Sequence, residues 1–186
     1  MEHLNKINST ALFLGSFDPI HLGHIKVLEH LIPRFLKVYL VPAFKNPWKI
    51  NQTDYNIRVR MCEAALKDYN LNDKVDIYLG NISPDSSGGY YTYKQIEDLA
   101  GKGYYIVGGT DIKNKIGAWK NSDWILENFN FYPIPRPGYK NETENPDLIE
   151  ISSSCIRNLI IKDKSIENLI SPGVIEIINE EKLYVV

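Results

Sequence analysis

Short apolar runs alternate along this chain with stretches in which apolar residues recur at helical spacing. This alternation is typical of βαβ units, in which a helix crosses from one parallel strand to the next. The apolar runs predict strands at residues 10–15, 37–42, 75–80, 104–108 and 129–134. The pattern therefore favours an α/β fold with a doubly wound parallel sheet of five or more strands.

Helices are expected between these strands and after the last of them. They are predicted at residues 21–31, 54–69, 92–100, 111–116, 122–128 and 153–161, and from Pro172 onward. Thr53 is the expected N-cap of the second helix, and Gly101 is expected to stop the third. Pro172 takes the favoured first position of the last helix.

The length and composition indicate one globular domain. The chain has 186 residues, of which 44% are hydrophobic and 24% are charged, which is enough to bury a proper core. Residues 1–186 are expected to form a single domain, with a Rossmann-like core at 1–150 and a small helical C-terminal subdomain at 151–186. The Gly-, Asn- and Pro-containing segment 138–148 is predicted to be a loop.

Charge and hydropathy argue against several classes of protein. The formal net charge is −2 and no run of Lys and Arg occurs, so a nucleic-acid partner is not expected. No apolar stretch is long enough to span a bilayer, and the apolar run at 11–14 is too short for a secretory signal. Cys62 and Cys155 lie far apart and are predicted to be free, buried thiols in a reducing cytosol. A cytoplasmic protein is predicted.

The segment Gly-Ser-Phe-Asp-Pro-Ile-His-Leu-Gly-His at residues 15–24 is the most informative part of the chain. It follows the first predicted strand and opens the first helix, and ligands bind at this turn in doubly wound sheets. Gly15 is expected to leave room for a phosphate beside the backbone, near the free N–H groups of the helix start. His21 and His24 are three apart and share a helix face. The arrangement suits transfer at a phosphate, where catalysis is mainly positioning and electrostatics.

The four histidines of the chain also have other possible roles. Asp18, His21 and His24 contain the right ligand types for a transition metal, but their spacing matches no metal motif, so no metal site is predicted. His3 and His30 stand alone in the sequence and are predicted to be structural.

The segment 15–24 resembles the (H/T)xGH signature of the nucleotidyltransferase superfamily. A second segment, residues 151–157, resembles the ISSTxIR signature of bacterial nicotinate-nucleotide adenylyltransferases, with Ser154 in place of Thr. Taken alone, hydroxyls at a helix start followed by Arg157 indicate either an anion site or a simple N-cap with a solvated Arg. Together with the first segment they favour the anion site.

Other parts of the chain are similar to the same family. Residues 109–111 resemble the Gly-x-Asp motif of the family, and Trp119 follows at the family's spacing. Residues 91–92 resemble its SYT segment, and residues 42–49 resemble its PA…PPHK loop. Arg58 matches its HR pair, residues 136–138 match its RPG motif, and residues 172–184 resemble its C-terminal helix. Without these flanking motifs, Trp119 is predicted to pack in the core. For Arg58 two interpretations stay open, a solvated helix charge and a role in the motif.

The resemblance implies an enzyme of NAD synthesis. ATP and nicotinate mononucleotide would give nicotinate adenine dinucleotide and pyrophosphate, with Mg²⁺ as the cofactor of ATP. The resemblance implies that His21, His24, Lys49 and Arg157 are catalytic; that Gly15, Ser16, Phe17, His24, Gly109, Asp111, Ser153, Ser154 and Arg157 bind ATP; and that Lys49, Tyr91, Thr92, Trp119 and Arg136 bind the mononucleotide.

The chain also departs from the family pattern, and alternatives stay open. Leu14 stands where the family commonly has Gly, and Trp48 and Ile57 stand where it commonly has His. Lys94 and Gln95 replace an Asp and a Thr of the family, and the stretch between residues 136 and 151 is shorter than usual. The alternatives are a related transferase acting on nicotinamide mononucleotide or another phosphorylated acceptor, and a nucleotide sensor without turnover. A cytidylyl transferase is disfavoured because no RTEGISTS-like segment occurs. A homo-oligomer is left open.

Overall fold

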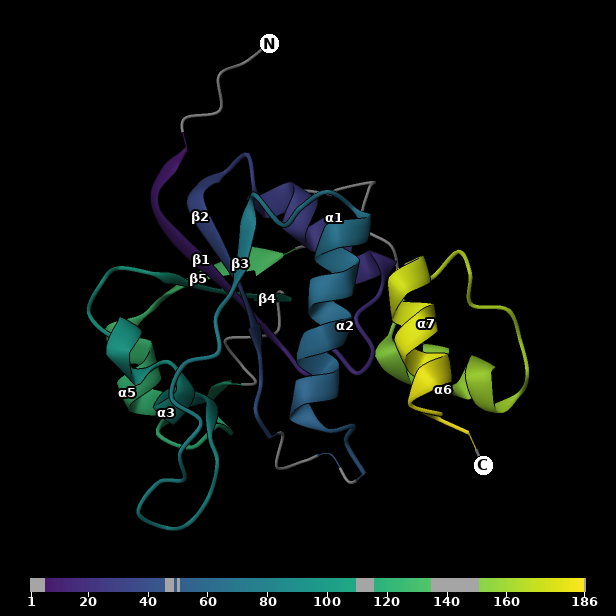
Figure 1. Ribbon diagram of the computed structural model, residues 1–186. Coiled ribbons are helices and arrows are strands. Elements are labelled where there is room, and N and C mark those ends of the chain that lie inside the picture. The colour runs from purple at the N-terminus through teal and green to yellow at the C-terminus, as the bar shows by residue number, and fades with distance from the viewer. Residues whose placement is uncertain (1–5, 46–48, 50, 110–115, 135–150, 186) are drawn as a thin grey trace.

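A computed structural model describes residues 6–45, 49, 51–109, 116–134 and 151–185 (Figure 1). Its centre is a five-stranded, parallel sheet with the strand order β3-β2-β1-β4-β5. The strands are β1 (Ile7–Gly15), β2 (Phe35–Pro42), β3 (Val75–Ile77), β4 (Tyr105–Gly109) and β5 (Asn130–Ile134). The predicted fold class and all five predicted strands are confirmed. The order reverses at β1, so the ends of β1 and β4 form the switch point where ligands bind in such sheets.

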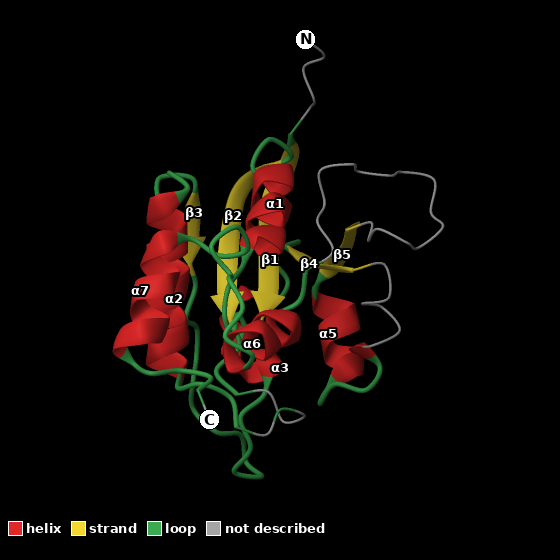
Figure 2. Ribbon diagram, turned by 90° about the vertical axis from the view of Figure 1, so that its right-hand side faces the viewer, coloured by secondary structure: helices red, strands yellow, loops and turns green. Residues whose placement is uncertain are grey.

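Helices cover both faces of the sheet. They are α1 (Leu22–Leu31), α2 (Tyr55–Asp68), α3 (Thr92–Gln95), the 3-10 helix η1 (Glu97–Leu99), α5 (Ser122–Asn128), α6 (Ser153–Ile161) and α7 (Pro172–Glu180). The arrows of β1 and β2 point toward the end of the sheet at which α3 and α6 lie (Figure 2). The predicted site is therefore expected at this end.

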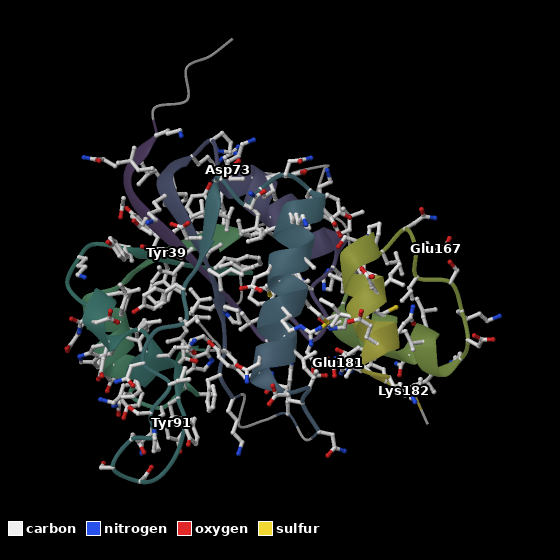
Figure 3. All side chains as sticks on the ribbon, viewed as in Figure 1. Tyr39, Asp73, Tyr91, Glu167, Glu181 and Lys182 are labelled. Carbon is white, nitrogen blue, oxygen red and sulfur yellow. The ribbon has the colours of Figure 1, made fainter. Side chains whose placement is uncertain are left out.

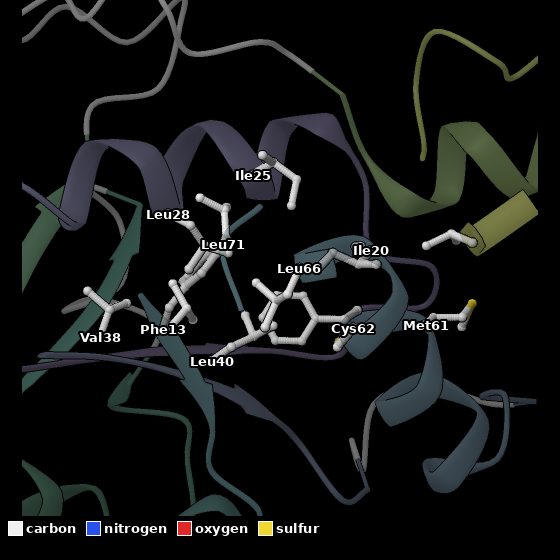
Figure 4. Packing of buried hydrophobic residues seen from close by; sticks show 14 of the residues in the cluster. Phe13, Ile20, Ile25, Leu28, Val38, Leu40, Met61, Cys62, Leu66 and Leu71 are labelled. Carbon is white, nitrogen blue, oxygen red and sulfur yellow. The ribbon is translucent and has the colours of Figure 1, made fainter. Parts of the chain in front are cut away.

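Alternate residues of β1 enter two separate cores. Ala11 and Phe13 pack with α1, α2, α6 and α7 in one apolar cluster, part of which Figure 4 shows. Leu12 packs with η1 and α5 in a second cluster, and the partly buried Leu14 contacts it. This alternation follows from the two-residue period of a strand, and it makes the sheet the middle layer of three. Leu14, which replaces a family Gly, is thus accommodated by packing.

Two details of the predicted helices are wrong. The N-cap of α2 is Asp54, whose Oδ1 accepts from Asn56 N–H at 2.8 Å, and not Thr53. The third helix is interrupted after Gln95. The main-chain carbonyl of Gln95 accepts from Asn81 N–H at 3.1 Å, and Leu99 N–H donates to the Ile96 carbonyl rather than to that of Gln95. The helix expected at 111–116 and the loop at 138–148 lie outside the described residues, except for Ile116.

The remaining expectations concern the caps and the cysteines. Gly101 has φ +70°, as a helix stop requires, and Pro172 begins α7. Cys62 is buried and Cys155 is exposed, so the prediction for Cys155 is wrong: Ile156, one residue on, takes the inward position of α6. Neither cysteine is in a disulfide. None of the described helices combines the length and the apolar character that crossing a membrane needs.

Candidate active site

The turn after β1 is shaped by a buried phenylalanine. Phe17 has φ +48° and is 1% exposed, and the Asp18–Pro19 peptide after it is cis. A Cβ built on Gly15 would lie 2.7 Å from the Phe17 ring. The side of Gly15 on which a Cβ would project is therefore occupied by the Phe17 ring. The Phe17 ring packs edge-on against His24 with 4.9 Å between centroids, so its side chain supports that imidazole.

His21 and His24 are neighbours, as their spacing predicts, and their rings also stack face to face. Their ring centroids are 3.6 Å apart with an interplanar angle of 26°. His21 is the N-cap of α1, and its main-chain N–H donates to His24 Nδ1 at 3.2 Å. Because Nδ1 accepts, a neutral His24 must carry its proton on Nε2. The Nε2–H of His24 is thereby set as a donor beside the start of α1.

Both imidazoles are neutral at pH 7. Burial lowers the pKa of His21 to about 4. The pKa of His24 is also lowered well below its usual value, first by burial and then by His21 and Lys49. The pair therefore offers hydrogen-bond donors to an anion rather than fixed positive charges.

The two sequence segments with family signatures meet at this turn. Ser152, the N-cap of α6, accepts from Cys155 N–H at 3.1 Å. The Ser153 hydroxyl donates to the Pro19 carbonyl at 2.9 Å. Arg157 donates from one terminal nitrogen to the Asp18 carbonyl at 2.7 Å and from the other to the Ser154 hydroxyl at 3.2 Å. The start of α6 is thus fastened to the turn before α1.

Cations gather around Asp18. Partial desolvation lowers the pKa of the Lys49 ammonium, the Asp18 carboxylate opposes that shift, and Arg157 and Arg58 add to it. The three predicted phosphate-binding groups, His24, Lys49 and Arg157, therefore share one electrostatic environment. No set of three His, Cys, Asp or Glu side chains within the described ranges is arranged to hold a metal ion.

A separate wall of the site is aromatic. An open pocket lies between the end of β2, the 81–91 loop and α3, and is lined by Phe44, Lys45, Asn81, Ile82, Ser83, Tyr90, Tyr91 and Gln95. Tyr91 is the N-cap of α3, so Thr92 begins that helix. Figure 3 shows Tyr91 beside the loop that projects at this end of the molecule. The half-buried Trp119 packs against the second core cluster.

Some predicted residues are placed only in part. The β1–β4 register pairs Phe13 with Val107, which sets Gly109 level with Gly15 at the ends of neighbouring strands. Asp111 and Arg136 lie outside the described residues. The main-chain carbonyl of Ser16 accepts a hydrogen bond from the Arg58 guanidinium at 2.7 Å.

Comparison with known proteins places the chain in a family. The cytidylyltransferase-like family model matches residues 12–159. The probable nicotinate-nucleotide adenylyltransferase of Flavobacterium johnsoniae is 30% identical over 195 residues, which cover 94% of this chain and 97% of that protein. Its counterpart from Cytophaga hutchinsonii is 31% identical, with the same coverage of both chains.

The chain belongs to the nicotinate-nucleotide adenylyltransferase family.

Solved structures agree with the fold. A Vibrio parahaemolyticus protein assigned as a nicotinate-nucleotide adenylyltransferase superposes with a TM-score of 0.68 at 27% identity, covering 96% of both chains. The Plasmodium falciparum nicotinic acid mononucleotide adenylyltransferase complexed with NaAD has a TM-score of 0.68 at 22% identity, covering 96% of this chain and 98% of that one. The second likeness bears on the fold alone.

Two departures from the family pattern serve the structure. Gln95 is 3% exposed; its amide donates to the carbonyls of Pro42 and Leu79 at 2.8 and 2.9 Å, and its oxygen accepts from Phe44 N–H at 3.2 Å. Gln95 therefore ties the ends of β2 and β3 to α3. Lys94 pairs with Glu97 at 2.7 Å, so its charge is already matched within the protein.

Arg58, a family residue left ambiguous by sequence, has a clear place. It is 1% exposed and donates to four main-chain carbonyls, those of Thr53, Ser16, Ala43 and Phe44, at 2.7–2.9 Å. The solvated interpretation of Arg58 is wrong. Its guanidinium instead joins the β1 turn, the end of β2 and the start of α2. Sequence reasoning assigned no role in the site to Asp18 or Tyr184, which the structure also places here.

Proposed function

We propose that this protein transfers the adenylyl group of ATP to nicotinate mononucleotide, releases pyrophosphate and forms nicotinate adenine dinucleotide for NAD synthesis. Family membership supports the reaction class. The observation that carries the proposal is the stacked, neutral His21–His24 pair at the start of α1, beside Arg157 and Lys49. This combination is suited to a phosphorus centre that gains charge during transfer.

The chemistry needs positioning rather than a covalent intermediate. An oxygen of the mononucleotide phosphate attacks the α-phosphorus of ATP, a new phosphorus–oxygen bond forms, and the bond to the β-phosphate breaks as pyrophosphate leaves. The attacking phosphate is already ionised, so no base is required. His24 Nε2–H donates to the oxygens of the reacting phosphate, with His21 beside it, and Lys49 and Arg157 bind the phosphates that depart.

The remaining contacts are part of the same proposal. ATP would also meet the main chain of the β1 turn and groups at the ends of β4 and α6: Gly15, Ser16, Phe17, Gly109, Asp111, Ser153 and Ser154. The mononucleotide would lie against the aromatic side of the site, with Tyr91, Thr92, Trp119 and Arg136 as its partners and Lys49 between the two substrates. Phe17 would contribute its main chain, because its ring is buried.

Mg²⁺ belongs to the proposal as the companion of ATP. In sites of this kind Mg²⁺ is held mainly by substrate phosphates and water, with few carboxylates. The donor set fits that role: the buried Asp18 carboxylate already accepts from Thr53 and Tyr184, and the charges of Asp18 and Arg157 both act on Lys49. Mg²⁺ would neutralise triphosphate charge. A cytoplasmic location remains the prediction from sequence.

Pyrophosphate release from the purified protein tests the proposal. ATP and CTP are each offered with nicotinate mononucleotide, nicotinamide mononucleotide, pantetheine phosphate and glycerol phosphate. ATP with nicotinate mononucleotide should be fastest. Binding of ATP without pyrophosphate release from any pair would indicate the sensor instead, and turnover with CTP would indicate the cytidylyl branch.

The acceptor panel also reports the choice between acid and amide. N–H groups at the start of α3 would form charge-assisted bonds with the nicotinate carboxylate that a neutral amide does not match. We expect kcat/KM to favour the acid by at least about tenfold, which is about 1.4 kcal/mol. Equal rates would remove the acid preference and leave adenylyl transfer standing.

A further inference from the structure

A tyrosine beyond the last helix reaches the turn before α1. The Tyr184 hydroxyl donates to Asp18 Oδ1 at 2.6 Å, across 166 residues of sequence. The Thr53 hydroxyl donates to the Tyr184 oxygen at 3.3 Å, and Thr53 N–H donates to Asp18 Oδ2 at 3.3 Å. Each carboxylate oxygen of Asp18 therefore receives a neutral donor.

Asp18 needs these donors because of where it lies. It is 3% exposed, and its charge acts on Lys49 and Arg58. A buried carboxylate beside cations is strongly drawn into an ion pair, since an unmatched buried charge is costly. Yet throughout the described part of the chain no Lys or Arg nitrogen lies within 4 Å of its oxygens. Neutral hydrogen bonds satisfy the carboxylate and leave the cations unpaired with it.

Packing of α7 against α2 fixes the segment that carries Tyr184. Gly173 N–H donates to Asp68 Oδ2 at 2.8 Å, and Arg60 forms ion pairs with Glu180 and Glu181. Burial and then the Asp18 carboxylate raise the pKa of the Tyr184 phenol, so it stays protonated and can only donate to that carboxylate. The contact is thus set by a docked helix rather than by a loose tail.

We propose that Tyr184 is a positioning residue for the transfer reaction: it holds the Asp18 carboxylate away from Lys49 and Arg157, which keeps both cations available to the triphosphate. The Asp18 main-chain carbonyl also accepts from Arg157, so a shift of Asp18 would move that guanidinium as well. This inference rests on the proposed function, because it assigns Lys49 and Arg157 to ATP.

The test compares Tyr184→Phe with Tyr55→Phe in the full chain. Both changes keep the ring and remove one hydroxyl, but the Tyr55 hydroxyl is buried with no hydrogen-bond partner within the described structure. Tyr184→Phe should raise the KM and the calorimetric Kd for ATP about tenfold, the scale of one hydrogen bond to a charged group. The acceptor KM should stay within about twofold, and Tyr55→Phe should leave the ATP constants within about twofold.

Rescue by Asp18→Asn separates positioning from simple stability. A neutral amide cannot capture a cation, so Tyr184→Phe should change the ATP Kd less than about twofold once Asp18 is Asn. A Tyr184→Phe protein with a lower unfolding temperature but an unchanged ATP Kd and KM overturns the inference, as does an equal effect in both Asp18 backgrounds.

If Tyr184→Phe does not yield folded protein, Thr53→Val is measured instead, since it removes the hydroxyl that orients Tyr184 and retains the Thr53 N–H. An ATP Kd raised about threefold supports the inference, and an unchanged Kd overturns it. If the unaltered protein releases no pyrophosphate with any acceptor, the proposed function fails, whereas the ATP Kd values still decide the role of Tyr184.

Discussion

The side of the site that is proposed to bind phosphate, around Asp18 and Arg157, and the side that is proposed to bind the acceptor, around Tyr91, are built differently. On the phosphate side, Arg157, Arg58 and Asp18 are held by hydrogen bonds to segments distant in the sequence. On the acceptor side the walls are rings: Tyr91 stacks on Tyr93 with centroids 6.2 Å apart, and the Lys120 ammonium lies 6.0 Å from the Tyr91 ring. The phosphate side thus holds hydrogen-bond donors in fixed directions, and the acceptor side presents the apolar faces of aromatic rings.

The difference matches what each half is proposed to bind. Stabilising charge at a reacting phosphate depends on donors that need no rearrangement. The hydrogen bonds that hold the groups of the phosphate side in place should therefore contribute directly to the rate. A planar base is bound by stacking, which tolerates small shifts. Loss of a single group should therefore change kcat or the binding of ATP on the phosphate side, and acceptor affinity on the other.

The largest expected effect is that of His24→Ala. Removing one donor to the reacting phosphate should lower kcat about 10²–10³-fold, with the acceptor KM little changed. His30→Ala on the same helix is the control, because His30 contacts Tyr132 rather than the site, and its kcat should be retained. A His24→Ala enzyme with near-normal kcat and an intact unfolding transition would contradict the claim that fixed donors on the phosphate side determine kcat.

Acid should weaken the phosphate side before the acceptor side. His21 has a folded pKa of about 4, below its unfolded value of 6.5, so the unfolded chain binds the extra proton between these values. Its contribution to stability is complete above pH 6.5 and falls as pH drops toward 4, by up to about 3 kcal/mol. Denaturant unfolding at pH 7 and pH 4 measures this loss, which His21→Asn should reduce.

On the acceptor side the group that titrates is Asp85, and it does so at lower pH than His21. Hydrogen bonds from Ser87 hold the pKa of Asp85 at about 2, below its usual 3.8, in the loop that leads to Tyr91. Its contribution is present above pH 3.8 and is lost only as pH falls toward 2. Fluorescence of the loop tyrosines should therefore stay unchanged between pH 6.5 and 4. An equal acid loss in the His21→Asn protein would contradict the assignment to His21.

Trp119→Ala probes stacking on the acceptor side. Base–aromatic stacking is worth about 1–3 kcal/mol, so kcat/KM for the mononucleotide should fall roughly 5- to 150-fold while the KM for ATP stays nearly constant. Trp124→Ala is a matched control, because Trp124 packs against the same core cluster. If both changes lower the unfolding temperature and neither affects the acceptor selectively, Trp119 is a packing residue.

The smallest expected effect is that of Arg157→Lys. A point charge replaces a planar fork that now bonds the Asp18 carbonyl and the Ser154 hydroxyl, so the KM for ATP should rise about tenfold with a smaller change in kcat. Arg60→Lys, on an exposed ion pair with Glu181, should leave the KM unchanged. An unchanged KM for Arg157→Lys would assign Arg157 to fastening α6 alone.

The strands were predictable because each parallel strand is a short apolar run between polar turns. The break after Gln95 was not, since it depends on Asn81, a residue that sequence proximity does not connect to it. Arg58 carried an overlooked signal: positions 58, 61, 62 and 65 share one helix face, and Met61, Cys62 and Ala65 are buried. That spacing places Arg58 on the apolar face of α2. Tyr184 gave no such signal, because its partner lies 166 residues away.

Placing α6 and α7 over the same side of the sheet as α1 and α2 sets an order of events during synthesis. Their apolar side chains Ile156, Val174, Ile177 and Ile178 enter the core after those of α1 and α2, because the ribosome makes them later. Until these helices dock, the nascent chain exposes the apolar face they will cover, the kind of surface that chaperones bind. The histidine pair can form earlier, but Arg157 joins it only when translation has passed α6, so a newly made chain should complete its proposed triphosphate site only after the whole sheet has been made.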